Sequence, residues 1–219
     1  MLSFYPVQCQ IKTLSKTLFL IAYLFINLLL PTQAYSASKT ILVLGDSLSA
    51  EYGLPRGKGW VALLEQRVEQ KHLNATVVNA SISGDTTSGG VARLPLLLSK
   101  HKPDIVIIEL GGNDALRGLD LKASELNFRS MIQQSKENKA KVLLVGMRIP
   151  PNYGKDYAER FFSIYAKLSK EQKISLVPFL LDGVAENSSL FQPDRIHPIA
   201  EAHPTILENV WPHLIPLMK

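Results

Sequence analysis

Five short, strongly apolar segments recur along the chain and alternate with longer segments whose apolar residues recur at helical spacing. Because the apolar residues of the short segments are consecutive and often β-branched, we expect strands that are buried on both faces, as in a parallel sheet. The alternation therefore predicts an α/β fold, a three-layer α/β/α sandwich with a five-stranded parallel sheet. The predicted strands cover residues 40–45, 75–80, 104–111, 141–147 and 174–179.

The intervening segments predict the helices that cover this sheet. A helix interrupted by Pro95 is expected in the second of them, and three prolines are expected to shorten or bend the last helix. No repeat, low-complexity tract or linker divides the sequence after residue 34, so residues 35–219 are expected to form one domain. The predicted helices cover residues 59–72, 86–100, 121–140, 156–173 and 199–217.

The first 34 residues are expected to be a secretory signal peptide. Lys12 and Lys16 precede the apolar segment 18–30, which is interrupted only by Asn27. A membrane span needs about 20 apolar residues, whereas the core of a signal peptide needs about 7 to 15. The length of the segment therefore favours a signal peptide, and an uncleaved membrane anchor is the alternative.

Small residues after the apolar segment predict cleavage near Ala34, with Ala37 as the second choice. The remaining domain is then expected to be periplasmic or secreted, with no membrane anchor after cleavage. Cleavage would lower the net charge from +5 to about +3 and remove Cys9, the single cysteine. Without a basic run or interleaved aromatic and basic residues, nucleic acid is not an expected partner. A monomer is the default expectation.

Glycine-rich and polar segments follow several predicted strands. In parallel α/β sheets, ligands bind beyond the carboxyl ends of the strands, so these segments are where chemistry is expected. They cover residues 45–49, 81–90, 111–118 and 192–198.

Together these segments contain the groups that acyl transfer from a serine requires. A serine nucleophile needs a base, usually histidine, which in turn needs a carboxylate to orient it. Ser47, His197 and Asp194 can provide these three groups. The backbone N–H groups of Ser47 and Gly84 and the amide of Asn113 can provide donors to an oxyanion.

The same residues also have structural interpretations. Ser47 could cap a helix, Asn113 could stabilise a turn, and Gly84 could permit a tight turn. Asp46 and Asp114 are expected to brace their loops rather than to act as catalytic acids.

Other polar residues favour no competing site. His203 has no acid three residues before it and is expected at the surface or at the start of a helix. The spacing of histidine, cysteine and acidic residues predicts no metal site. The segment 111–114, "GGND", lacks the lysine and the spacing of a phosphate-binding loop.

Four ordered motifs resemble the GDSL, or SGNH, hydrolase family: "GDSLS" at 45–49, the loop around Gly84, "GGND" at 111–114 and "DRIHP" at 194–198. The wider pattern is similar to its bacterial secreted arylesterases, acyl-CoA thioesterases and lysophospholipases. The resemblance covers nearly all of the chain after the predicted signal peptide. It implies a flavodoxin-like strand order of 2-1-3-4-5 and no metal or organic cofactor.

Carried over by position, the resemblance implies that Ser47 is the nucleophile, His197 the base and Asp194 its orienting acid. It implies that Gly84 and Asn113 complete the oxyanion hole with the Ser47 N–H. The segment 115–120 resembles a mobile loop that covers an acyl chain. Substrate-binding roles are expected for Ala115, Leu116, Arg117, Gly118, Leu119 and Ile196. Arg195 and Ile199 depart from the family pattern, which often has a smaller residue and asparagine at these positions.

The function implied is a secreted serine esterase that hydrolyses fatty-acyl esters or thioesters through an acyl-serine intermediate. Its substrate would be a small-molecule acyl ester or thioester, with lysophospholipids among the candidates. A carbohydrate or peptidoglycan O-acetylesterase on the same fold is the nearest alternative. A binding module without turnover and a flavodoxin-like nucleotide binder are the others.

Overall fold

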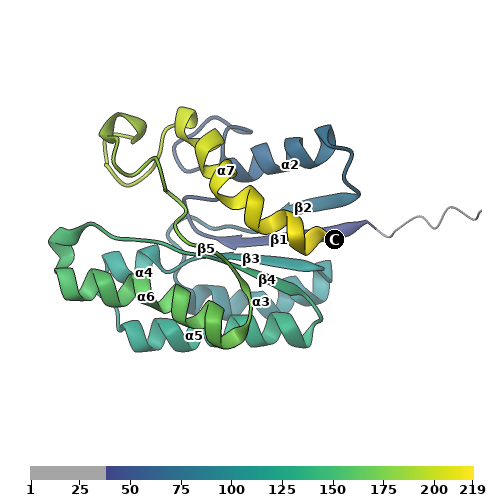
Figure 1. The fold of residues 1–219 in the computed structure, drawn as a ribbon, viewed down its shortest axis with the longest axis horizontal. Coiled ribbons are helices and arrows are strands. Elements are labelled where there is room, and N and C mark those ends of the chain that lie inside the picture. Colours follow the sequence, from purple (N-terminus) through teal and green to yellow (C-terminus); the bar gives the residue numbers. More distant parts are fainter. Residues whose placement is uncertain (1–37) are drawn as a thin grey trace, which may run out of the picture. The chain divides into compact units, whose positions relative to one another are not determined.

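A computed structural model describes residues 38–219, and a sheet of five parallel strands forms its centre (Figure 1). The strand order is β2-β1-β3-β4-β5, as the family resemblance implied. In the register of β1 and β3, Gly45 lies opposite Glu109, so the segments after these two strands begin side by side. The strands are β1 (Lys39–Gly45), β2 (Ala75–Asn79), β3 (Ile105–Glu109), β4 (Lys141–Val145) and β5 (Ser175–Val177).

Helices cover both faces of this sheet, and the predicted three-layer sandwich is confirmed. In Figure 1, α2 and α7 lie on one side of the sheet, and α3, α5 and α6 lie on the other. The helices are α2 (Trp60–Gln70), α3 (Thr87–His101), α4 (Gly112–Leu116), α5 (Leu121–Glu137), α6 (Lys155–Gln172) and α7 (His203–Leu214). Short 3₁₀ turns are η1 (Pro151–Tyr153), η2 (Ser188–Leu190), η3 (Ala200–Ala202) and η4 (Ile215–Met218).

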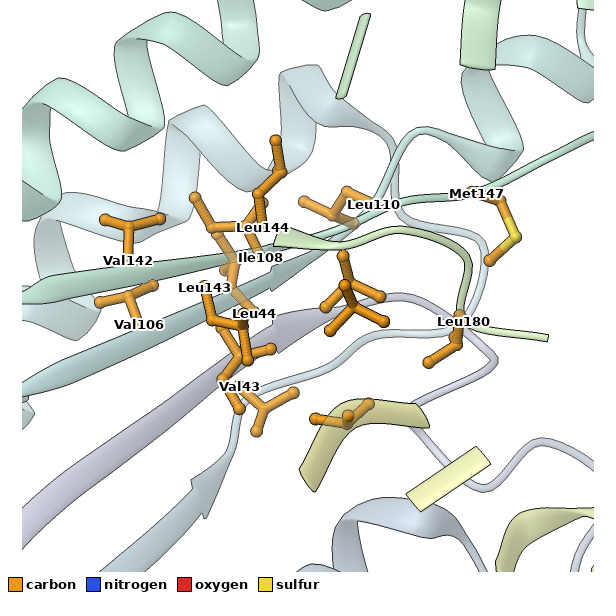
Figure 2. Packing of buried hydrophobic residues seen from close by; sticks show 14 of the residues in the cluster. Val43, Leu44, Val106, Ile108, Leu110, Val142, Leu143, Leu144, Met147 and Leu180 are labelled. Carbon is orange, nitrogen blue, oxygen red and sulfur yellow. The ribbon is translucent and has the colours of Figure 1, made fainter. Parts of the chain in front are cut away.

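The core is built from consecutive apolar residues of the central strands. Leu44, Ile108 and Leu144 occupy matching positions of β1, β3 and β4 and are fully buried. Figure 2 shows these side chains close together within the sheet. β2 differs from the expectation of burial on both faces: its residues are only partly buried or exposed, because it is an edge strand. The apolar packing therefore fixes β1 and β3, the two neighbouring strands that the segments of Ser47 and Asn113 follow.

Two helical regions differ from the sequence-based expectation. The segment 111–118 was expected to be a loop, but it contains α4, which is too short for its apolar periodicity to be recognised. The single helix expected over 199–217 is divided into η3, α7 and η4. Pro204 is tolerated in the first turn of α7, where its missing N–H would have no helical partner. Pro95 lies inside α3 without ending it.

No helix within residues 38–219 is long and apolar enough to cross a membrane. The predicted signal peptide, residues 1–34, lies outside the described residues.

Candidate active site

The candidate site is built from segments that leave the carboxyl ends of the strands. The serine loop, residues 46–53, follows β1, and α4 follows β3, its neighbour in the sheet. The Asp–His loop, residues 191–198, comes from the long connection between β5 and α7. Phe191 and Pro198 form an antiparallel bridge that closes this loop at its base. Residues that are far apart in the sequence thus converge at one edge of the sheet.

The serine loop is a tight turn held by its own backbone. The carbonyl of Asp46 accepts hydrogen bonds from the N–H groups of Ser49 and Ala50 at 3.2 and 3.0 Å. The Asp46 carboxyl oxygen Oδ1 accepts another from the N–H of Leu48 at 3.1 Å, which confirms the expected bracing role of this acid. Ser47 therefore lies within a rigid turn, directly after a buried strand.

Ser47, His197 and Asp194 form a continuous hydrogen-bonded chain. His197 Nε2 lies 2.8 Å from Ser47 Oγ, and His197 Nδ1 lies 2.7 Å from Asp194 Oδ2. A carboxylate beside Nδ1 keeps the proton on that nitrogen, which leaves Nε2 able to accept the serine proton. This is the order of groups that nucleophilic catalysis by a serine requires.

Asp194 also organises the turn that carries His197. Its Oδ1 accepts hydrogen bonds from the backbone N–H groups of Ile196 at 2.9 Å and His197 at 3.0 Å. Burial raises the pKa of Asp194, but these bonds and the contact with the His197 side chain lower it, and the result is a pKa below the usual value. Asp194 is therefore favoured in the ionised form that can orient an imidazole.

Gly84 and Asn113 lie in the loops after β2 and β3. Gly84 has a φ of +78°, a left-handed conformation that a side chain would strain, and its carbonyl accepts a hydrogen bond from Arg117 Nη2 at 3.0 Å. Asn113 donates from Nδ2 to Asp46 Oδ2 at 3.0 Å, which orients its amide against the serine loop. Within residues 38–219, no hydrogen bond is recorded for the N–H of Ser47 or of Gly84.

A buried acid that the sequence reasoning did not single out lies beneath the serine loop. Glu109, the last residue of β3, accepts a hydrogen bond from Ser49 Oγ at 2.7 Å. Ser49 Oγ in turn accepts one from Trp60 Nε1 at 3.2 Å. Burial, and next the charge of Asp46, raises the pKa of Glu109 well above its usual value. The available signal was an acid that ended the otherwise apolar segment "IVIIE".

Asp46 is the second buried carboxyl group of this region. Burial raises its pKa to about 6, against the opposing effects of the hydrogen bonds from Leu48 and Asn113. The same carboxyl group thus contacts both the serine loop and the amide of Asn113.

Two further expectations can be compared with the structure. Asp114 accepts hydrogen bonds from the N–H of Thr87 at 2.9 Å and from Ser124 Oγ at 3.1 Å, so its bracing role is confirmed. His203 begins α7, as one alternative held, but the expectation that it lies at the surface is wrong. It is buried, and its Nδ1 accepts a hydrogen bond from the N–H of Trp60 at 2.9 Å because α7 packs against α2.

The residues expected to bind substrate differ in accessibility. Ala115 is buried and Leu116 is partly buried in α4. The exposed members of the set are Arg117, Gly118, Leu119 and Ile196. Leu119 and Ile196 thus present apolar side chains in the segments that carry Asn113 and His197.

Residues 43–204 match the family described as GDSL-like lipase/acylhydrolase. The chain is 50% identical over 183 residues to esterase TesA of Pseudomonas aeruginosa, covering 84% of this chain and 91% of that protein. It is 44% identical over 195 residues to thioesterase 1/protease 1/lysophospholipase L1 of Escherichia coli, covering 89% and 92%. A crystal structure of the psychrotrophic esterase EstA from Pseudoalteromonas, inhibited by monoethylphosphonate, superposes with a TM-score of 0.78 at 38% identity, covering 81% and 97%.

Proposed function

The chain belongs to the GDSL-like lipase/acylhydrolase family, and from this premise we propose that it hydrolyses fatty-acyl esters and thioesters through an acyl-Ser47 intermediate. Its family and its esterase and thioesterase relatives show that it is an ester-hydrolysing enzyme, with small-molecule esters as substrates. The observation that carries the proposal is the unbroken contact from Asp194 through His197 to Ser47, at 2.7 and 2.8 Å.

In the first half of the reaction, Ser47 Oγ attacks the carbonyl carbon while its proton passes to His197 Nε2. The carbonyl oxygen becomes an oxyanion, for which the N–H groups of Ser47 and Gly84 and the Asn113 amide are the proposed donors. Collapse of the tetrahedral intermediate breaks the bond to the alcohol or thiol, which takes the proton from Nε2. The acyl group remains on Ser47.

In the second half, His197 removes a proton from water as the water oxygen attacks the acyl-Ser47 carbonyl carbon. The same donors stabilise the second oxyanion. Its collapse breaks the bond to Ser47 Oγ, which regains the proton from Nε2, and the fatty acid leaves. The Ser47 proton leaves on the alcohol or thiol, and a proton from water replaces it, so the cycle consumes only ester and water.

Exposed apolar residues in the segments that carry Asn113 and His197 support an acyl substrate. Leu119 and Ile196 are 43% and 46% exposed, although each is a large aliphatic residue that is usually buried. A long acyl chain lying against them would remove this surface from water. An acetyl group is too short to do so, which favours the acyl esterase over the O-acetylesterase alternative.

The first test is hydrolysis of p-nitrophenyl esters from acetyl to palmitoyl, with Ser47→Ala as the control. Serine-dependent turnover that peaks at medium or long chains is expected. Turnover confined to the acetyl ester would favour an O-acetylesterase instead. Equal rates for Ser47→Ala and the unaltered protein would contradict the proposed nucleophile.

The same chain-length series with acyl-CoA and lysophospholipid substrates tests the finer substrate classes. Release of free thiol or of fatty acid is expected, and both should be lost in Ser47→Ala. Absence of thioester turnover alongside rapid ester turnover would restrict the proposal to oxygen esters.

We also propose that the chain is exported and that residues 1–34 are then removed. The remaining protein is proposed to be a monomer. The charged residues followed by the short apolar segment 18–30 support export. Amino-terminal sequencing of the protein recovered from the periplasm or medium should begin at Tyr35. An intact amino terminus in a membrane fraction would contradict cleavage.

A further inference from the structure

The side chains of Tyr52 and Gln192 connect the serine loop with the Asp–His loop. Tyr52 ends the turn that begins at Ser47, and Gln192 precedes Asp194 by two residues. Neither residue belongs to the hydrogen-bonded chain of Ser47, His197 and Asp194. Both residues nevertheless contact His197, Tyr52 at the imidazole ring and Gln192 at the backbone carbonyl group.

Tyr52 is fixed at its backbone and places its ring against the imidazole. Its N–H donates to the carbonyl of Ser47 at 3.3 Å, and its own carbonyl accepts from Gln192 Nε2 at 2.9 Å. The ring centroids of Tyr52 and His197 lie 4.3 Å apart, with 39° between the planes. The backbone N–H and carbonyl groups of Tyr52 are therefore both tied, one to Ser47 and the other to Gln192.

Gln192 joins the two loops through one amide nitrogen. Besides the carbonyl of Tyr52, Nε2 donates to the carbonyl of Pro198 at 3.1 Å. The backbone N–H of Gln192 donates to the carbonyl of His197 at 2.7 Å. A Cβ added at Gly53 would clash with Gln192 Oε1, so the amide packs directly against the serine loop. Gln192 thus holds both His197 and the residue after it.

Such a connection matters because His197 comes from a loop that few buried groups support. Asp194, Arg195 and Ile196 are all exposed. A displacement of a reacting group by about 1 Å can lower a rate about 100-fold. A ring on one side of the imidazole and an amide that ties the loops together would limit such displacement.

We propose that Tyr52 and Gln192 are positioning residues that hold the His197 imidazole at hydrogen-bonding distance from Ser47. The inference rests on the proposed roles of Ser47 and His197. Tyr52 acts through its ring, which packs on the imidazole, and Gln192 acts through the two carbonyl groups that it bridges. Neither group exchanges a proton with the substrate.

Tyr52→Leu is expected to lower kcat about 10-fold with little change in KM, because the imidazole loses its packing partner. Tyr52→Phe keeps the ring and is expected to retain kcat within about twofold. Within residues 38–219 the Tyr52 hydroxyl group forms no hydrogen bond, so the ring alone should be enough to hold the imidazole. Tyr153→Leu removes another exposed aromatic ring, from the segment after β4, and should leave kcat unchanged.

The conservative variant separates positioning from a loss of folded protein. Tyr52→Phe keeps the ring and should keep both kcat and the rate of inactivation, whereas a smaller folded fraction would appear as a lower melting temperature of Tyr52→Leu.

Gln192→Leu removes both bridging hydrogen bonds at similar side-chain size and is expected to lower kcat about 10-fold. If Tyr52 and Gln192 act together, the effects of the two substitutions are not additive. The kcat of the double variant should then be no more than about twofold lower than the kcat of the less active single variant. Gln133→Leu, on the exposed surface of α5, is the matched control and should keep kcat.

All variants are compared by kcat, KM, melting temperature and rate of inactivation by a fluorophosphonate. The inference is supported if kcat and the inactivation rate both decrease in Tyr52→Leu and in Gln192→Leu, and if the melting temperatures show that both variants are folded under the assay conditions. It is overturned if both keep wild-type kcat, or if the controls lose as much. Equal turnover of Ser47→Ala and the unaltered protein would instead overturn the proposed function, so the two failures are distinguishable.

Discussion

The serine loop and the Asp–His loop reach the same site but are held in different ways. Asp46 and Ser49 of the serine loop are buried and are joined by hydrogen bonds to the buried residues Glu109 and Trp60. The Asp–His loop is exposed at Asp194 and is organised by hydrogen bonds within its own turn. One half of the site is thus part of the protein core, and the other half is a local surface structure.

Because the two loops are held differently, we expect substitutions in them to have different effects on activity and on stability. Substitutions of buried, hydrogen-bonded groups lower the free energy of unfolding, because they leave a buried polar group with neither a protein partner nor water to bond. Changes in an exposed turn affect mainly the geometry of the groups that it carries. We therefore expect substitutions in the Asp–His loop to separate activity from stability, and substitutions under the serine loop to combine them.

The largest effect is expected for Asp194→Asn. An amide nitrogen beside His197 Nδ1 would move the imidazole proton to Nε2, where it opposes proton transfer from Ser47. We expect kcat to fall about 10²- to 10⁴-fold with little change in melting temperature. Glu186→Gln, an exposed acid in the same β5–α7 connection, is the control and should keep kcat. A large loss of melting temperature in Asp194→Asn would remove the contrast between the loops.

Asn113→Ala tests the side of the site that is tied to the core. It removes a proposed oxyanion donor and the hydrogen bond to Asp46. Loss of one such donor should lower kcat about 10²- to 10³-fold, mainly without a change in KM. Because Asp46 is buried, a measurable decrease in melting temperature should accompany the loss. Near-wild-type turnover would exclude Asn113 from the oxyanion site.

Glu109→Gln should change the pH dependence of stability. Between the usual pKa of 4.5 and the raised pKa of the folded state, the native protein holds a proton that the unfolded chain has released. The contribution of Glu109 to the free energy of unfolding therefore decreases as pH rises above about 4.5. Glutamine does not titrate, so the variant should become more stable relative to wild type at higher pH. Urea denaturation at pH 5 and pH 8 measures this, and an unchanged difference would contradict it.

The smallest effect is expected at Arg195, which has a φ of +58° in the turn between Asp194 and His197. Any residue other than glycine is strained in this conformation, because its Cβ lies too close to the backbone. Arg195→Gly should be more stable than Arg195→Ala by about 1 kcal/mol, with kcat within about twofold of wild type. Thermal unfolding of the two variants provides the comparison. Equal stability would show that the turn is free of strain.

The parallel sheet, and the segments that meet at its carboxyl edge, could be predicted from the amino-acid sequence. Consecutive apolar residues are required wherever a strand is covered on both faces, so the central strands were recognisable. Ser47 and Asn113 were recognisable because their motifs directly follow predicted strands. Asp194 and His197 were recognisable because their motif directly precedes the last predicted helix. The family resemblance supplied the order of the strands, which spacing alone leaves open.

The contacts between these segments could not be predicted, because they depend on the three-dimensional fold. Ser47 and His197 are 150 positions apart, and no local periodicity encodes their distance of 2.8 Å. Glu109 ends an ordinary apolar strand, and its contact with Ser49 depends on the neighbouring position of β1 and β3. The burial of His203 and the packing of Tyr52 on His197 likewise follow from elements brought together by the sheet. Local sequence specifies which elements form, whereas side-chain environments arise from contacts between distant elements.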